Sequence, residues 1–356
     1  MIEQYGWSDR LRQDFAPFAA RDLTPGRVVV QQRGLYGLVT ELGELSAEIS
    51  GRLAHEAGEG GYPAVGDWVA AAARPAEGAA TIHHVLPRAT SFVRRAAGPK
   101  LAEQVVAANV DVAFLVASLN ADLNARRLER YLSTAWQSGA KPVIVLIKAD
   151  LCDDVGEALE EIEAVAFGTP VLAVSAITGE GLEAVRAHLG PGLTAVLVGS
   201  SGVGKSTLLN ALAGEEMMAV GAISGDALHG RHTTTHRELV LLPGGGLMLD
   251  TPGMRELGLW DSDDGLSVTF EDIEQLAERC HFRDCAHGSE PGCAVREALH
   301  DGALDHGRWK SYQKLQRELA HLERKEDRAA HEAERRRWIA ISKAQRAGKK
   351  ARGKAW

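Results

Sequence analysis

The stretch over residues 193–214 constrains the fold of this chain more than any other part of the sequence. An apolar run leads into Gly199-Ser-Ser-Gly-Val-Gly-Lys-Ser206, and a leucine-rich segment follows. This is G-x-x-x-x-G-K-[ST] between a predicted strand and a predicted helix, the pattern of a phosphate-binding P-loop. Because both flanks fit, a glycine-rich turn that matches by accident explains the stretch poorly, and we expect nucleotide phosphates to bind here.

The residue types of this loop suit that chemistry. Gly199 and Gly204 allow the backbone to wrap around a phosphate chain, whose charge meets amide N–H groups and the positive end of the following helix. Lys205 is the expected catalytic cation that reaches the β- and γ-phosphates, and the Ser206 hydroxyl is expected to bind Mg²⁺. The predicted nucleotide-binding residues of the loop are Gly199, Ser200, Ser201, Gly202, Val203, Gly204, Lys205, Ser206 and Thr207.

Strands and helices alternate in the predicted pattern around this loop. Buried apolar runs at 109–119, 141–151, 169–176 and 193–198 are separated by stretches with helical spacing. Parallel strands that are covered on both faces read as such near-continuous apolar runs. We therefore predict a doubly wound parallel α/β sheet, with the P-loop after one of its strands.

Three further short motifs lie at predicted strand ends. Residues 250–253 read Asp-Thr-Pro-Gly, in which Asp250 is expected to reach Mg²⁺ through water and the Gly253 amide to sense the γ-phosphate. The other two are similar to guanine-binding motifs: Lys148, Ala149 and Asp150 resemble the end of N-K-x-D, and Ser175 and Ala176 resemble a motif whose backbone touches guanine O6.

Asp150 is the residue that predicts the base. A carboxylate accepts hydrogen bonds from guanine N1–H and N2–H₂ together, whereas adenine offers no such pair of donors on that edge. The expected ligands are therefore GTP and GDP. A P-loop ATPase or kinase remains the alternative enzyme, and an RNA-binding scaffold with a structural nucleotide is the alternative of another class.

The order of these motifs is unusual. In most GTPases the P-loop comes first and the guanine motifs come last, but here residues 148–150 and 175–176 precede the loop at 199–206. The domain is therefore predicted to be circularly permuted. Strand ends can still meet in space, so the site is expected to be intact, and the chain passes from the switch at 250–253 directly into a cysteine-containing segment.

The first hundred residues show a different pattern of predicted secondary structure. After a partly helical lead-in over residues 1–24, short β-prone runs follow one another at intervals of about ten residues. This spacing predicts a small antiparallel barrel. An OB-fold would bind oligonucleotides, with Arg88, Arg94 and Arg95 after the last strand, while an SH3-like or purely packing barrel stays open at this point.

Three of the four cysteines crowd into fourteen residues. Cys280, Cys285, His287 and Cys293 form a Cys₃His set that suits one structural Zn²⁺ in a closed tetrahedral site. In a reducing compartment such a cluster favours a metal site over a disulfide. His281 and His300 are alternative ligands, free buried cysteines are the alternative to a metal site, and the isolated Cys152 is interpreted as a packing residue.

Charge is distributed unevenly along the chain. The net charge is −8, but residues 335–356 carry nine basic and no acidic side chains, whereas residues 101–260 carry a net −9. The basic end indicates a local contact with a polyanion, with a solvated helix end as the alternative. No apolar run approaches the roughly 20 residues that span a membrane, and the N-terminus is too polar for a signal peptide. We expect a cytoplasmic protein without membrane contact.

These motifs together resemble one family, the circularly permuted ribosome small subunit-dependent GTPase A (RsgA) proteins. The resemblance covers nearly the whole chain: the barrel, the permuted GTPase, residues 230–235, the Asp250 motif and the Cys-x4-Cys-x-His-x5-Cys cluster. It implies a multidomain protein with an OB-fold at 1–98, a GTPase domain at 101–260 and a helical zinc-binding domain with a basic tail at 261–356.

The resemblance also implies a function. A member of this family is expected to bind the small ribosomal subunit and its rRNA and to couple GTP hydrolysis to late maturation of the subunit, which would stimulate the hydrolysis. Nothing in the sequence demands more than a monomer. Two further groups are expected to hold Mg²⁺ beside Ser206: Asp250, and a hydroxyl of Thr233, Thr234 or Thr235, of which Thr234 is the expected catalytic residue.

Two positions depart from common GTPases. Ile147 stands where most guanine motifs have Asn, which contacts the base and braces the P-loop, so we expect nucleotide affinity to be lower by about 1–3 kcal/mol with guanine preference kept. Met254 follows Gly253 and cannot orient water as Gln would. Intrinsic hydrolysis should therefore be slow, and His232, His236 or the partner is expected to supply the orienting group.

Overall fold

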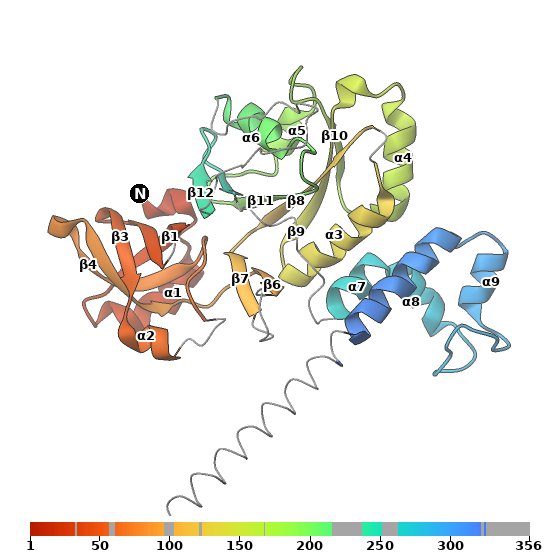
Figure 1. Ribbon diagram of the computed structural model, residues 1–356, viewed down its shortest axis with the longest axis horizontal. Coiled ribbons are helices and arrows are strands. Elements are labelled where there is room, and N and C mark those ends of the chain that lie inside the picture. Colours follow the sequence, from red (N-terminus) through yellow and green to blue (C-terminus); the bar gives the residue numbers. More distant parts are fainter. Residues whose placement is uncertain are drawn as a thin grey trace, which may run out of the picture.

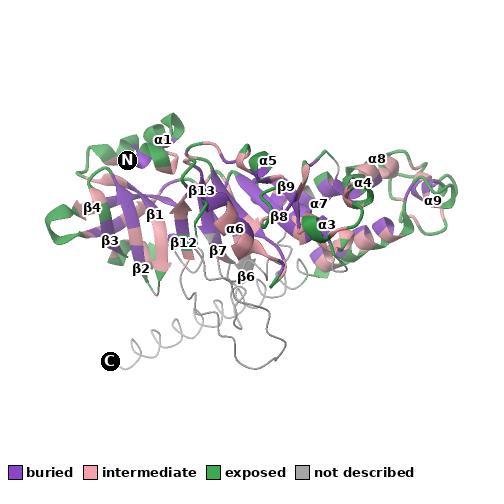
Figure 2. Ribbon diagram, turned by 90° about the horizontal axis from the view of Figure 1, so that it is seen from above, coloured by how far each residue is buried: buried purple, intermediate pink, exposed green. Residues whose placement is uncertain are grey.

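A single large sheet organises the structure, which is a computed structural model describing residues 1–32, 34–56, 61–95, 103–120, 123–166, 168–215, 237–250, 263–321 and 324. Its eleven strands run in the order β10-β9-β8-β11-β13-β12-β1-β2-β3-β5-β4. A barrel lies at one end, a layered α/β unit in the middle and a group of helices at the other end (Figure 1). Among the described residues, buried positions are more frequent in the strands than in the rest of the chain (Figure 2). Within the described residues, no helix is both long and apolar enough to cross a membrane.

The N-terminal strands close into a barrel. Its members are β1 (Thr24–Gln32), β2 (Leu35–Thr40), β3 (Gly43–Ile49), β4 (Trp68–Arg74) and β5 (Ala79–Val85), with α2 (Gly51–Glu56) after β3 and a 3₁₀ turn, η2 (Pro75–Glu77), after β4. The order β1-β2-β3-β5-β4 closes because β4 pairs back to β1. This is the five-stranded Greek-key barrel of an OB-fold, which confirms that prediction.

One pairing differs from the antiparallel barrel that the sequence predicts. β3 and β5 run parallel, from Ser46 opposite Ala79 to Ile49 opposite Ile82. The chain leaves β3, crosses by way of α2 and β4, and returns beside β3 in the same direction. The series of β-prone runs in the sequence does not indicate this direction. Apolar side chains such as Val28, Leu38 and Ile82, all fully buried, fill the barrel.

The lead-in packs against the outside of this barrel. η1 (Ile2–Tyr5) and α1 (Asp9–Ala19) place Trp7 and Phe15 against Trp68 of β4. The Trp7 and Trp68 rings lie 4.8 Å apart between centroids. Ser8 caps α1 by accepting a hydrogen bond from the Leu11 N–H, so the lead-in has a defined helix start.

A hairpin joins the barrel to the α/β unit. β6 (Ser91–Arg95) pairs antiparallel with β7 (Glu103–Ala108), a hairpin that was not predicted from the sequence pattern. Arg88, which precedes it, is held by Asp67: the guanidinium donates to both oxygens of the fully buried carboxylate, at 2.8 and 2.7 Å. Arg88 therefore has a structural partner, and the side chains of Arg94 and Arg95 lie outside the described residues.

The central unit is an α/β sandwich. Its parallel strands are β8 (Val112–Ser118), β9 (Lys141–Ile147), β10 (Val171–Val174), β11 (Thr194–Val198) and β13 (Leu247–Asp250). α3 (Ala125–Ser138) and α4 (Val155–Ala166) pack with one apolar cluster, and α5 (Leu182–Arg186) and α6 (Lys205–Ala213) with another. A doubly wound sheet is thus confirmed. β12 (Arg237–Leu241), however, runs antiparallel to β13.

β12 also joins the two units into one sheet. It pairs antiparallel with β1, with Val30 opposite Glu238 and Gln31 opposite Arg237. Nearby, Arg27 of β1 is only 2% exposed. Its guanidinium donates to the carbonyls of Tyr5 and Asn109 and, at 2.8 Å, to the Thr194 hydroxyl. Burial lowers the pKa of Arg27 to about 10, so the side chain remains a cation at neutral pH.

The C-terminal helices pack on α3. They comprise α7 (Asp263–Thr269), α8 (Glu271–Glu278), α9 (Ala294–His300) and a helix described over residues 306–321. Their shared core includes Phe270, Ile273 and Tyr312. Arg308, 4% exposed, donates to Glu129 of α3 at 3.0 Å and to both oxygens of Asp272 at 2.8 Å. The predicted domain limits at 98/101 and 260/261 stay a prediction.

Candidate nucleotide and metal sites

The loop between β11 and α6 has a backbone that glycine alone accommodates well. Gly204 has φ +122°, and a β-carbon there would lie 2.6 Å from Ile147 Cδ1. A β-carbon at Gly199 would lie 2.5 Å from the Val116 carbonyl oxygen. Both positions therefore need glycine: Gly204 because of its positive φ and its contact with Ile147, and Gly199 because the chain lies so close to Val116 of β8. The sequence places these glycines where a P-loop requires them.

Lys205 lies over this loop. Its Nζ donates to the carbonyls of Gly199 and Ser200, both at 2.7 Å. The ammonium is thus held inside the turn that residues 199–204 make, with Ser206 next to it in the first turn of α6. A cation, a helix N-terminus and a glycine-rich turn at one point fit a phosphate chain with a divalent cation.

The sheet brings the separated motifs to one edge. β9 ends at Ile147, directly before Lys148, Ala149 and Asp150, and its parallel neighbour β10 ends before Ser175. β11 and β13 end before the P-loop and at Asp250. Since carboxyl ends of parallel strands share an edge, residues far apart in the permuted sequence meet here.

The turns after β9 and β10 have specific local geometry. Lys148 has φ +63° and ψ +41°, a left-handed conformation uncommon for a residue with a side chain. It turns the chain sharply, so that the exposed Asp150 follows in a short 3₁₀ turn, η3 (Ala149–Leu151). Ser175 is buried, and its hydroxyl accepts from the Thr178 N–H at 3.1 Å, which fixes the turn that contains Ala176.

Ile147 contacts the P-loop directly. Its side chain is 3% exposed and belongs to the same apolar cluster as Val203 of the loop. Where most GTPases have an Asn that braces the P-loop, this chain has an apolar contact at Gly204. The expected effect of Ile147 on affinity stays a prediction.

Several predicted site residues lie outside the described residues. The backbone of Asp250 ends β13 and pairs with Glu238, but its side chain is not described. The expected roles of these residues therefore stay predictions: His232, Thr233, Thr234, Thr235, His236, Gly253 and Met254.

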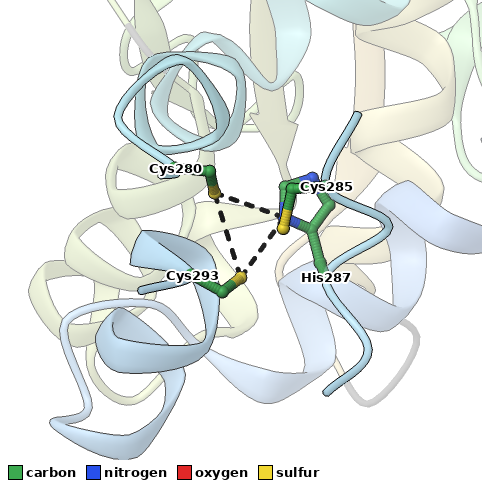
Figure 3. Close-up of side chains that lie close together, drawn as sticks. All are labelled: Cys280, Cys285, His287 and Cys293. Atoms are coloured by element: carbon green, nitrogen blue, oxygen red, sulfur yellow. Dashed lines mark hydrogen bonds between the residues drawn. The ribbon is translucent and has the colours of Figure 1, made fainter. Parts of the chain in front are cut away.

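The cysteine cluster converges on one point. The Cys293 Sγ and Cys280 Sγ lie 3.4 and 3.6 Å from His287 Nδ1 and 3.9 Å from each other (Figure 3). With Cys285, all four ligand atoms lie within 4.8 Å of one another. A tetrahedron with Zn–S of about 2.3 Å and Zn–N of about 2.0 Å has edges of roughly 3.5–3.8 Å. The donor set therefore fits Zn²⁺, and the alternatives His281 and His300 are not part of this group.

Local backbone supports the sulfur atoms. Burial raises the pKa of the Cys280 thiol, but N–H groups of Val295 and Ala294 at the start of α9 outweigh it and hold that pKa below its ordinary value. Burial and the neighbouring thiols raise the pKa of Cys285 to about 11. The Cys280 thiol therefore loses its proton more readily than the Cys285 thiol. The His287 ring packs edge-on against Trp309, with 5.6 Å between the ring centroids.

Two contacts of this region escape the sequence analysis. Arg127 of α3 donates to the Ser200 hydroxyl of the P-loop at 2.9 Å, although 73 residues separate them. Arg27 joins the barrel to β11 through Thr194. No motif marks either arginine, and only the fold pairs them with their acceptors. Cys152, in contrast, packs against the core as interpreted.

The structure combines a closed OB barrel with an α/β sheet. In this sheet the turns after β9 and β10 come before the P-loop in the sequence, which defines the class of circularly permuted P-loop GTPases. The chain belongs to the RsgA GTPase family, whose model matches residues 85–260. It is therefore a GTP hydrolase. A second model, for 50S ribosome-binding GTPases, matches residues 194–331.

Relatives and solved structures agree with this family. The small ribosomal subunit biogenesis GTPase RsgA of Opitutus terrae is 48% identical over 99% of both chains. The crystal structure of YjeQ from Thermotoga maritima gives a TM-score of 0.63 at 28% identity, covering 84% of this chain and 99% of that one. YloQ, a circularly permuted GTPase, gives 0.60 at 26% identity, covering 84% and 96%.

Proposed function

We propose that this GTPase binds the small ribosomal subunit and couples GTP hydrolysis to a late step of its maturation, with the subunit stimulating the hydrolysis. The observation that carries the proposal is the meeting of the P-loop, the turn at Asp150 and the turn at Ser175 on one sheet edge, in a chain that also holds an OB barrel and a Cys₃His cluster. The relative from Opitutus terrae, 48% identical, bears the name of a small ribosomal subunit biogenesis GTPase.

The nucleotide is held by residues with distinct roles. Backbone N–H groups of residues 199–204 and the Lys205 ammonium bind the phosphates. The Asp150 carboxylate accepts from the guanine base, and Ser175 and Ala176 position the backbone that faces guanine O6. Lys148 supports this turn through its left-handed conformation.

Mg²⁺ neutralises charge on the β- and γ-phosphates when it is bound. The Ser206 hydroxyl, the Asp250 carboxylate through water and one hydroxyl from Thr233, Thr234 or Thr235 would hold it. The Gly253 amide responds to the presence of the γ-phosphate. Because Met254 cannot orient the attacking water, contact with the subunit brings His232 or His236 of residues 221–236 to that position.

RNA contacts come from the two outer units. The OB barrel, the Cys₃His region with one structural Zn²⁺ and the nine basic residues of 335–356 bind rRNA. Each neutralised phosphate releases counterions, so this binding weakens steeply with salt. The protein acts as a monomer on the subunit.

The test is steady-state phosphate release from GTP and from ATP, with and without purified small subunits. The proposal is supported if small subunits strongly stimulate the turnover of GTP but not that of ATP. Lys205→Ala with subunits is the control for contaminating hydrolases. Equal turnover of ATP contradicts the role given to Asp150. GTP turnover that subunits do not change contradicts the ribosomal coupling and leaves a GTPase with another partner.

A further inference from the structure

The side chain of Arg127 links helix α3 to the P-loop. Arg127, in the first turn of α3, donates from Nη1 to the Ser200 hydroxyl at 2.9 Å. The helix start is fixed, because Asn124 caps it by accepting from the Arg127 N–H at 3.0 Å. The guanidinium therefore extends from a backbone position that is itself held in place.

A small cavity adjoins this contact. It measures about 10 Å³ and lies between α3 and the P-loop, lined among others by Ser118, Tyr131 and Val203. The charge of the guanidinium strengthens its hydrogen bond to Ser200. The P-loop binds phosphate mainly through backbone N–H groups, which leaves the Ser200 hydroxyl available for Arg127.

The opposite side of α3 is anchored in the C-terminal helices. Glu129 is fully buried and accepts from Arg308, and Arg130 pairs with Glu318 at 2.8 Å. α7 packs so closely that a β-carbon at Gly265 would overlap the Ser133 carbonyl. Figure 1 shows α3 between the sheet and these helices. Helix α3 thus contacts the P-loop on one side and the C-terminal helices on the other.

We propose that Arg127 is a positioning residue for GTP hydrolysis, which sets the P-loop through Ser200 from a helix held by the C-terminal unit. The inference rests on the GTPase activity of the family and on the P-loop assignment, and it does not depend on the ribosomal partner. The P-loop holds the phosphates before and during the reaction, so loss of this contact should weaken substrate binding more than it slows turnover.

A double-mutant cycle tests the proposal in the full-length protein. Arg127→Ala and Ser200→Ala should each weaken GTP binding about fivefold to tenfold, and the double variant should be no weaker than either single variant, because both remove the same bond. KM should rise while kcat changes less than about threefold, and Arg127→Lys should recover part of the affinity.

Arg130→Ala is the matched control, since it removes the same charge from the same helix but only a partly exposed ion pair with Glu318, while the buried Glu129–Arg308 pair still holds α3. It should leave GTP affinity within about twofold of wild type. Fully additive effects of Arg127→Ala and Ser200→Ala, or wild-type affinity in Ser200→Ala, would overturn the inference. If the wild-type protein itself fails to bind GTP, the P-loop assignment is wrong instead, so the two failures are distinguishable.

Discussion

Replacement of Ile147 by Asn tests how the nucleotide site is supported. Ile147 ends β9, is 3% exposed, and places Cδ1 2.6 Å from the point that a β-carbon on Gly204 would occupy. An Asn at this position would bring its amide within reach of the P-loop and the bound base. The substitution therefore exchanges an apolar support for a polar one at a single, well-defined contact.

Two opposing effects follow from this geometry. Loss of the buried apolar side chain costs roughly 1.5–3 kcal/mol of folding free energy. An amide that lacks a partner in the nucleotide-free protein adds about 1–3 kcal/mol. Nucleotide binding supplies partners for that amide, and affinity should rise by about 1–3 kcal/mol, or roughly fivefold to 150-fold in Kd. Ile147→Asn should thus be less stable without nucleotide and bind GTP more tightly.

Calorimetric titration with GDP and a non-hydrolysable GTP analogue measures the affinity, and thermal unfolding with and without GDP measures the stability. Ile147→Val is the control: it removes one methyl group beside Gly204, costs about 0.5–1.5 kcal/mol and adds no amide. Guanine preference should persist in both variants, since Asp150 is unchanged. An Asn variant that binds no more tightly than the Val variant refutes the reasoning.

Two other predictions concern the Cys₃His cluster and the buried Arg27. Chelation of zinc, or Cys285→Ser, should make residues 263–321 sensitive to proteolysis, because the metal would organise the C-terminal core, and GTP should still bind, no more than about tenfold more weakly, since α3 then loses part of its anchor while the P-loop keeps its own backbone; unchanged proteolysis would contradict a structural zinc. Arg27→Met should lower the free energy of unfolding by about 2–5 kcal/mol, since the Tyr5 and Asn109 carbonyls lose their charged donor; chemical denaturation measures this, and a loss below about 1 kcal/mol would show that these acceptors find other partners.

The sequence was most informative where function depends on local pattern. The P-loop is a continuous stretch whose glycines meet steric demands at Gly199 and Gly204, so its conformation could be predicted from eight residues. The cysteine spacing likewise predicted four ligands that converge in the structure. The alternation of apolar runs predicted the sheet, and with it the edge at which the motifs meet.

Pairings between distant residues could not be predicted in this way. The antiparallel direction of β12, the parallel contact of β3 with β5 and the β6–β7 hairpin depend on how the chain returns to itself. Arg27 and Arg127 look like ordinary surface cations in the sequence, and each bonds a hydroxyl that lies more than seventy residues away, that of Thr194 and that of Ser200. Burial of a polar group is a property of the assembled fold.

The antiparallel pairing of β1 with β12 covers an edge of the α/β sheet. An unpaired edge strand is a template for addition of another strand, and therefore for self-association. Here the barrel occupies that edge of the α/β unit, and β10, only four residues long, ends the sheet on the other side. Expression of the GTPase unit without its barrel would uncover β12, so the barrel acts as a solubility cap for the enzyme to which it is fused.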